Sequence, residues 1–201
     1  SPCTLRGTDT LLYSMPRIIR KTDKITVVIL SRRLSKETGE LLLEEEFLRK
    51  IVKEEGIAQF VRIIPGITDK RDLRELLYVS DVVVLPFKII FSQVPLSVLE
   101  AMALGKTVIT TDIGPLPDIV GKNRGLTVKS SDASGLASAI AYLIEHPEES
   151  KNIGMNAKEF ALSMPNWDEV VSQNISLIGR VRDDSVMNLI NSKLYRRLTL
   201  K

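Results

Sequence analysis

The chain has 201 residues, of which 44% are hydrophobic and 26% are charged, a balance typical of a globular protein and not of a disordered one. This length suits one domain, or one domain with an appendage. The net charge of +3 leaves room for an anionic ligand, but it is too small to indicate nucleic-acid binding, so we expect no nucleic-acid partner.

Short β-branched runs alternate along the chain with amphipathic segments. The expected strands span residues 25–30, 60–65, 81–86, 107–112 and 125–129. The expected helices span residues 8–20, 44–56, 70–79, 95–104, 133–145, 149–162 and 167–180. The strands are almost continuously apolar, so we expect a sheet that is covered on both faces. The alternation predicts an α/β fold with a Rossmann-like, doubly wound parallel sheet and right-handed crossovers.

Two of the expected helices have residues that are typical of helix ends. Asp69 is expected to cap the helix of residues 70–79, and Gly105 is expected to end the helix of residues 95–104. Pro95 is a favourable first helical residue, because that position needs no backbone N–H group.

The carboxyl ends of the strands are where a doubly wound sheet binds its ligands. Three segments reach that edge, namely "TLRG" before the first helix, "FKIIFSQV" after residue 86, and the expected turn "IGPLPD" after residue 112. A helix N-terminus offers N–H groups to an anion, and a guanidinium can hold a phosphate through two hydrogen bonds. We therefore expect Arg6 to contact an anionic ligand, with an arginine that only contacts water as the alternative.

Glu100 is the one charged residue in "PLSVLEAMAL". At 3.6 residues per turn its neighbours on the same face are Leu96, Ser97, Ala103 and Leu104, so we expect the carboxylate to sit among apolar groups. A buried carboxylate needs hydrogen-bond donors. These donors could be the two hydroxyls of a ligand diol such as a ribose, or a backbone N–H group or arginine of the protein itself.

Three other features, two residues and the basic end of the chain, are expected to be structural and not part of a functional site. His146, the only histidine, ends a helix before Pro147 and is expected to be a cap and not a metal ligand, because no other histidine or cysteine pair accompanies it. Lys88 in "PFKIIF" is interpreted as an exposed loop lysine, with a ligand contact as the alternative. The basic stretch at residues 192–201 is expected to be a solvated helix end, with a membrane-surface or partner-domain contact as the alternative.

Several segments together resemble a known family. "RGTDTLLYSMP", "LLYVSDVVVLPF", "SVLEAMALGKTVITTDIGPLPDIV", "GLTVKSSDASGLASAIAYLI" and "NWDEVV" are similar, in order and spacing, to the C-terminal, donor-binding half of retaining family-4 glycosyltransferases (glycosyl transferases group 1), which have the two-domain GT-B fold. The resemblance runs from about Arg6 to Leu177, and its most specific part is "LEAMALGKTVI".

The resemblance implies a site for a nucleotide-diphosphate sugar. In the family the glutamate of "LEAMA", here Glu100, binds the ribose hydroxyls, and the basic residue before the glycine, here Arg6, supports the diphosphate; these two are the expected catalytic residues. Backbone groups at about residues 64–67 are expected to hold the base. The positions that the resemblance assigns to donor binding are Arg6, Gly7, Ile64, Pro65, Gly66, Ser92, Gln93, Val94, Pro95, Leu96 and Glu100.

The chain departs from the family pattern at three positions. Where the family commonly has a second glutamate and a glycine in E-x-x-G, this chain has Ser92 and Pro95. Ser92 is shorter and neutral, which leaves the donor sugar open, and Pro95 removes one N–H group from the anion site. Many members also have an arginine five residues before the position of Arg6, where this chain has Ser1, so the expected phosphate contacts are fewer.

These features predict the donor half of a glycosyltransferase of the hexosyltransferase type, active in glycan biosynthesis. The resemblance implies that transfer to a saccharide or lipid-linked acceptor proceeds with retention and without a metal ion or other cofactor, with the leaving phosphate assisting the acceptor hydroxyl. A non-catalytic module that binds a nucleotide or a partner protein is the alternative. A dinucleotide oxidoreductase fits less well, because no G-x-G-x-x-G follows any expected strand.

The expected organisation is a nucleotide-sugar-binding domain over residues 1–180 and a basic helical tail over residues 181–201. The chain begins with "SPCTLRG", so we expect it to be part of a longer protein, with the family's central first strand and its acceptor-binding N-terminal domain upstream. No apolar run approaches the roughly 20 residues of a membrane span. With Cys3 as its single cysteine, the chain fits a reducing compartment, so we expect a cytoplasmic protein, at the inner membrane surface if the basic tail binds lipid.

Overall fold

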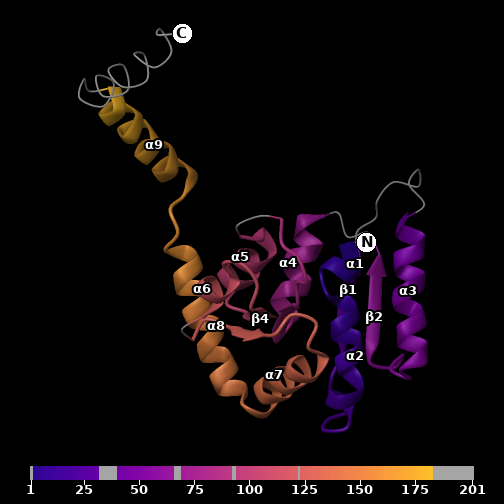
Figure 1. The fold of residues 1–201 in the computed structure, drawn as a ribbon. Helices are drawn as coiled ribbons and strands as arrows, with labels where there is room; N and C mark the ends of the chain where they lie inside the picture. Colours follow the sequence, from indigo (N-terminus) through magenta and orange to yellow (C-terminus); the bar gives the residue numbers. More distant parts are fainter. Residues whose placement is uncertain (1, 32–39, 66–68, 92–93, 122, 183–201) are drawn as a thin grey trace, which may run out of the picture. The chain divides into compact units, whose positions relative to one another are not determined.

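The computed structural model describes residues 2–31, 40–65, 69–91, 94–121 and 123–182. The chain divides into two compact units, Ser1–Ala161 and Leu162–Lys201. The first unit contains the described strands and the helices before α9 (Figure 1). The boundary expected at residue 180 stays a prediction.

The strands of the first unit are all parallel to their neighbours. β1 (Val27–Ser31) pairs with β2 (Val61–Pro65), and β3 (Val82–Leu85), β4 (Thr107–Thr111) and β5 (Leu126–Val128) form a second sheet in that order. In register, Ile29 lies opposite Ile63 and Ile109 lies opposite Leu126. The five expected strands are therefore present, and in the part of the chain that the structure describes they form two parallel sheets instead of one.

Helices connect and cover these strands. They are α1 (Pro2–Leu5), α2 (Thr8–Ile19), α3 (Glu40–Glu54), α4 (Lys70–Val79), α5 (Leu96–Ala103), α6 (Leu116–Val120), α7 (Ala133–Glu145) and α8 (Pro147–Leu162). α3 begins four residues before the expected start, and α1 was not expected. The prolines of "IGPLPD" were interpreted as a turn, but Pro115 is the N-cap of α6, and a helix start tolerates proline because its first N–H groups have no intrahelical partner.

The core joins the two sheets through α2. Leu12, Met15 and Ile18 of this helix have no exposed surface, and they belong to one apolar cluster with Ile29 of β1 and Ile109 of β4. α2 also packs against α7 and α3. The two sheets are thus held on one core, and the start of α2 is placed by packing on both.

The middle strand β4 is buried on both faces, as the apolar pattern predicted. All five of its residues are buried. Because successive side chains of a strand point to opposite faces, Ile109 joins the cluster around α2, and Val108 joins a second cluster with Val98 and Met102 of α5 and Leu116 of α6. Helices therefore cover both faces of the three-stranded sheet.

The predicted start of α4 and the predicted end of α5 are confirmed. The Asp69 carboxylate accepts a hydrogen bond from the Arg71 N–H group at 2.8 Å. Gly105 has φ +73°, and the N–H groups of Gly105 and Lys106 donate to the carbonyls of Met102 and Ala101, the paired bonds of a Schellman motif. The prediction for Pro95 is wrong by one position, because Pro95 has extended backbone and is the N-cap of α5.

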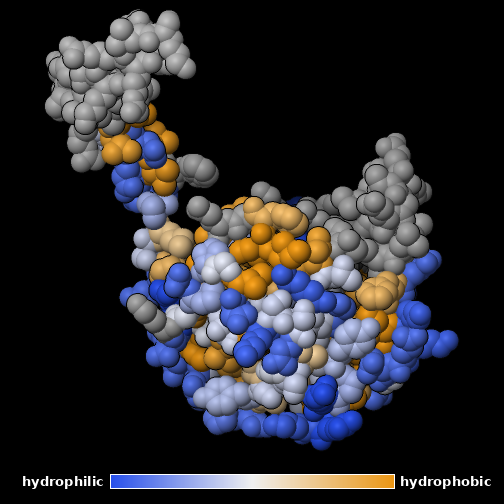
Figure 2. All heavy atoms as spheres, in the orientation of Figure 1, coloured by the Kyte–Doolittle hydropathy of each residue, from blue (hydrophilic) through white to orange (hydrophobic). Residues whose placement is uncertain are grey.

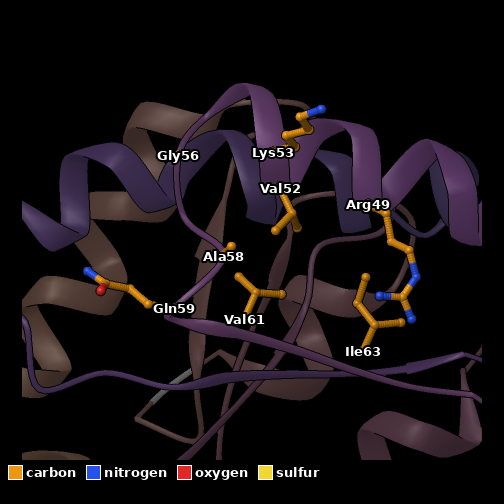
Figure 3. Close-up of a pocket in the computed structure, with 8 residues that line it drawn as sticks. All are labelled: Arg49, Val52, Lys53, Gly56, Ala58, Gln59, Val61 and Ile63. Carbon is orange, nitrogen blue, oxygen red and sulfur yellow. The ribbon is translucent and has the colours of Figure 1, made fainter.

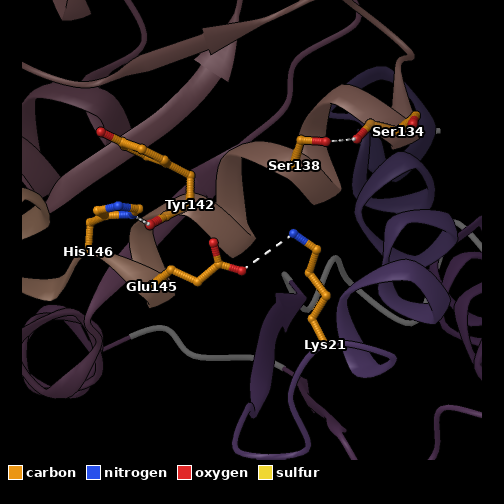
Figure 4. A network of polar contacts seen from close by, with 6 residues as sticks. All are labelled: Lys21, Ser134, Ser138, Tyr142, Glu145 and His146. Carbon is orange, nitrogen blue, oxygen red and sulfur yellow. Dashed lines mark hydrogen bonds and ion pairs between the residues drawn. The ribbon is translucent and has the colours of Figure 1, made fainter.

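The contact between α7 and α2 has a polar border (Figure 4). Lys21 Nζ lies 3.4 Å from Glu145 Oε1, and both side chains are more than half exposed. His146 is the C-cap of α7, as predicted, and its ring stacks on Tyr142. The Tyr142 hydroxyl donates to Glu149, and this hydrogen bond raises the pKa of Tyr142 above its ordinary value.

In the second unit, α9 (Trp167–Arg182) begins with reciprocal hydrogen bonds between Asn166 and Glu169, a capping box. Val171, Ile175 and Ile178 are exposed on this helix. Among the helices that the structure describes, none combines the length and the apolar character that a bilayer span needs.

We expect Thr111→Val to lower the free energy of unfolding by about 1–3 kcal/mol. The buried Thr111 hydroxyl donates to the Phe87 carbonyl at 2.6 Å, and valine of nearly the same shape leaves that carbonyl without this donor. Urea unfolding measures the loss. Thr127→Val, on the exposed face of β5, is the control and should change the free energy by less than about 0.5 kcal/mol; equal effects of the two substitutions would contradict the assignment.

Candidate functional site

Two segments far apart in the sequence meet at the carboxyl end of β3. The N–H groups of Lys88 and Ile89, in the loop after β3, donate to the Leu5 carbonyl at 2.8 and 3.2 Å. Leu5 ends α1, two residues before Gly7, the N-cap of α2. The turn that contains Arg6 is therefore attached by main-chain hydrogen bonds to the end of β3, the edge at which the sequence predicts a ligand.

Gly7 allows this approach. Its φ is +73°, and a Cβ atom placed on it would lie 1.8 Å from the Pro86 carbonyl oxygen. No other residue type fits here without moving the backbone of the turn or of Pro86. Gly7 also has no side chain to cap α2, and the Arg6 side chain is exposed beside it. The structure thus places the Arg6–Gly7 turn and the start of α2 at the carboxyl end of β3, and the anion site there stays a prediction.

The interpretation of Lys88 as an exposed loop lysine is wrong. Its ammonium donates to Asp9 Oδ2 at 2.6 Å, and the two side chains are 27% and 12% exposed. The other carboxylate oxygen of Asp9 accepts from the Thr10 N–H group at 2.9 Å. The loop after β3 lies close to the start of α2. The Lys88 side chain therefore reaches Asp9 in the first turn of that helix instead of extending into solvent.

Glu100 was expected among apolar groups, and this expectation is also wrong. The buried face of α5 consists of Val98, Ala101 and Met102, whereas Glu100 is exposed and Leu96, one turn earlier, is 72% exposed. Of the four neighbours on its face, Leu96 is exposed and Ser97, Ala103 and Leu104 are half-buried, so this face is not covered by the core. Within the described residues, no side chain or N–H group donates to the Glu100 carboxylate, so the alternative of a partner in the protein itself finds no support there.

The remaining predicted site residues divide into two groups. Ile64 is half-buried in β2, Pro65 is the last residue of that strand, and Val94 is half-buried before the Pro95 N-cap. Gly66, Ser92 and Gln93 lie outside the residues that the structure describes.

Sequence reasoning missed Asp9, although a signal for its pairing was present. Asp9 lies on α2 three residues before the buried Leu12, which places a carboxylate on an apolar helix face. Lys88 is the only charge in "VVVLPFKIIF". An isolated acid and an isolated base, each in buried surroundings, indicate an ion pair, because each needs a partner when it leaves water.

Apolar side chains are exposed next to this site. Ile89 is 48% exposed and Phe91 is 87% exposed in the segment between β3 and α5, and Leu96 begins α5. In Figure 2 apolar side chains gather on the visible face in the region of α5. A ligand or chain segment that lies against this edge would therefore meet an apolar surface beside Glu100.

A shallow hollow at the other side of the fold is a different feature (Figure 3). It lies between the end of α3 and β2, and Arg49, Lys53, Gln59 and Val61 are among its lining residues. Its position toward the amino end of β2 argues against a ligand site, because doubly wound sheets bind at the carboxyl ends. In the described ranges, no cluster of three or more His, Cys, Asp or Glu side chains could hold a metal ion.

Comparison with known protein families assigns the chain to one of them. Residues 5–160 match the family described as "Glycosyl transferases group 1". The chain belongs to this family. The resemblance carried by "LEAMALGKTVI" is thereby confirmed.

Relatives of this group 1 glycosyltransferase support the assignment. The chain is 27% identical over 175 residues to the GDP-mannose-dependent alpha-(1-6)-phosphatidylinositol monomannoside mannosyltransferase of Mycobacterium tuberculosis, over 84% of this chain and 43% of that protein. It resembles the structure of sucrose-phosphate synthase from Thermosynechococcus elongatus with a TM-score of 0.75 and 23% identity, over 89% of this chain and 43% of that one. HepE of Anabaena in complex with UDP-glucose gives a TM-score of 0.74 and 19% identity, over 90% and 46%.

These similarities confirm the Rossmann-like α/β fold of one half of a GT-B enzyme. The chain spans less than half the length of the curated relatives it matches.

Proposed function

We propose that the chain is the donor-binding half of a glycosyltransferase, which transfers a hexose from a nucleotide-diphosphate sugar to a saccharide or lipid-linked acceptor. The observation that carries this proposal is the match of residues 5–160 to the group 1 glycosyltransferases, in whose pattern Glu100 is the ribose-binding glutamate; its carboxylate is exposed on α5, where a ligand can reach it. A carboxylate in this state can accept two hydrogen bonds from a vicinal diol. The UDP-glucose bound to HepE, a protein of the same fold, supports a nucleotide-sugar as the ligand.

The proposed roles are those that the family resemblance assigns to each residue. Arg6 binds the diphosphate and stabilises its charge as the sugar leaves, in place of a metal ion, with Gly7 letting the backbone approach. The backbone of Ile64, Pro65 and Gly66 holds the base. Residues 92–96 have the proposed role of binding the sugar and the phosphates.

Retention of configuration is proposed with the leaving phosphate as the group that assists the acceptor hydroxyl. In this scheme the chain's residues hold and neutralise the phosphate, and no side chain of the chain acts as nucleophile. We further propose a cytoplasmic location, where nucleotide-sugars and a reduced Cys3 are compatible.

A non-catalytic nucleotide- or partner-binding module is the second candidate. It is favoured by Ser92 and Pro95, which replace a glutamate and a glycine of the family pattern. Calorimetric titration of the chain with UDP, GDP and their sugar conjugates separates the candidates in part: binding of a conjugate tighter than its nucleoside diphosphate supports a donor site, and absence of all binding would overturn the proposed function.

Glu100→Gln should weaken nucleotide-sugar binding about tenfold or more, because a hydrogen bond to a charged group is worth roughly 1.5–3 kcal/mol. The melting temperature should not change, since the carboxylate is exposed. Calorimetry and thermal unfolding measure the two effects. Glu159→Gln, an exposed glutamate of α8, is the control. Unchanged affinity with a lowered melting temperature would show that Glu100 has a structural role instead.

Arg6→Ala should weaken binding of the nucleoside diphosphate much more than binding of the bare nucleoside, because only the former has the phosphates that the guanidinium contacts. Arg6→Lys should restore part of the affinity, since lysine keeps the charge but lacks the planar, bidentate group. Arg17→Ala, an exposed arginine near the other end of α2, should change neither. Equal losses for nucleoside and diphosphate would argue against a phosphate contact.

The 201-residue chain alone should bind donor but transfer no sugar. Its candidate site lies along one edge of the sheets, whereas transfer needs a second surface that holds the acceptor in reach and excludes water. The assay supplies radiolabelled nucleotide-sugars and a panel of saccharide and lipid-linked acceptors to the chain alone and to the chain joined to its natural upstream half. Sustained, acceptor-dependent turnover by the chain alone would refute this division of roles.

A further inference from the structure

Lys88 contacts the chain on both sides of the Arg6–Gly7 turn. Its N–H group donates to the carbonyl of Leu5, just before the turn, and its ammonium donates to the carboxylate of Asp9, just after it. A single residue of the loop after β3 thus holds both ends of the segment that presents Arg6.

The Lys88–Asp9 pair differs in burial from the other ion pairs of the described residues. Its side chains are 27% and 12% exposed, whereas those of Lys21 and Glu145 are 59% and 54% exposed. Exposed pairs contribute little, because water screens them and ordering two long side chains costs entropy. For a mostly buried pair, removal of one partner leaves the other charge without compensation. Loss of one partner of the Lys88–Asp9 pair should therefore destabilise the local structure more than loss of a partner in an exposed pair.

Asp9 also has an electrostatic consequence for the site. It lies in the first turn of α2, where the helix dipole favours a negative charge. A carboxylate at this position repels a diphosphate and competes with it for the same dipole. The ammonium of Lys88, 2.6 Å from Asp9 Oδ2, neutralises that carboxylate and leaves the end of the helix attractive to an anion.

We propose that Lys88 is a positioning residue for diphosphate binding, which acts through its pair with Asp9. It fixes the turn that carries Arg6 and cancels the charge that would oppose the phosphates. This inference rests on the proposed function, because it takes the Arg6–Gly7 turn as the phosphate-binding element.

The test compares Lys88→Met, which keeps a flexible apolar stem but removes the charge, with the unchanged 201-residue chain. The affinity for UDP or GDP, whichever the chain binds, should fall about tenfold, as for the loss of one charge-assisted interaction. The affinity for the matching nucleoside should stay within about twofold, well under the roughly 1.4 kcal/mol of a tenfold change. Lys88→Arg, which keeps the charge, should retain most of the diphosphate affinity.

A double variant separates positioning from general damage. Adding Asp9→Asn to Lys88→Met removes the unpaired carboxylate, so the diphosphate affinity should recover in part relative to Lys88→Met alone. Hydrogen exchange, measured without any nucleotide, should show faster exchange at the amides of residues 88 and 89 in Lys88→Met, because their bonds to the Leu5 carbonyl depend on the same loop contact.

Lys21→Met is the matched control, since it removes a lysine from an ion pair at the other end of α2, about 18 Å along a helix of 12 residues. It should leave diphosphate affinity and the exchange of both amides unchanged. Equal losses for nucleoside and diphosphate in Lys88→Met, unchanged exchange, or no recovery in the double variant would overturn the inference. Binding by the unchanged chain with no effect of Lys88→Met refutes this inference alone, whereas no binding by the unchanged chain refutes the proposed function as well.

Discussion

The approach of Gly7 to the Pro86 carbonyl is the constraint on which the site depends. It is possible only because residue 7 has no Cβ atom and adopts a positive φ. From this contact it follows that α2 begins at the carboxyl end of β3, that Arg6 lies beside that end, and that the loop after β3 donates two hydrogen bonds to Leu5. The core then keeps the arrangement in place, because α2 packs on the residues of both sheets.

The two faces of the three-stranded sheet support different parts of the proposed site. The cluster around α2 holds the phosphate-binding turn of the proposed function, and the cluster under α5 orients the helix that carries Glu100. β4 connects them, since Val108 packs on one side and Ile109 on the other. The hydroxyls of Thr110 and Thr111 also donate to carbonyls of Leu85 and Phe87, which couples this strand to the loop that contacts α2. The two halves of the candidate site are thereby supported by one buried strand.

The proposed donor site combines polar contacts with an apolar border. Phe91 and Leu96 expose most of their side chains near the N-terminus of α5, an arrangement that is unfavourable in water. In the proposed function such a border has a use, because an acceptor and a second protein surface would meet the donor here. In the proposed function, Ser1 stands where many family members have an arginine that contacts the phosphates, so the Lys88–Asp9 pair would contribute more to keeping Arg6 in place.

The sequence by itself determined the strands, most helices, the Asp69 cap, the Gly105 helix end and the family, because each is encoded by residues close together in the chain. Only the tertiary structure decided that Glu100 faces solvent: helical periodicity identifies which residues share a face, but not what covers that face. It also decided the pairing of Lys88 with Asp9, which are 79 residues apart. The neighbours of each residue in the sequence indicate that it needs a charged partner, but which residue that partner is depends on how helices and strands pack.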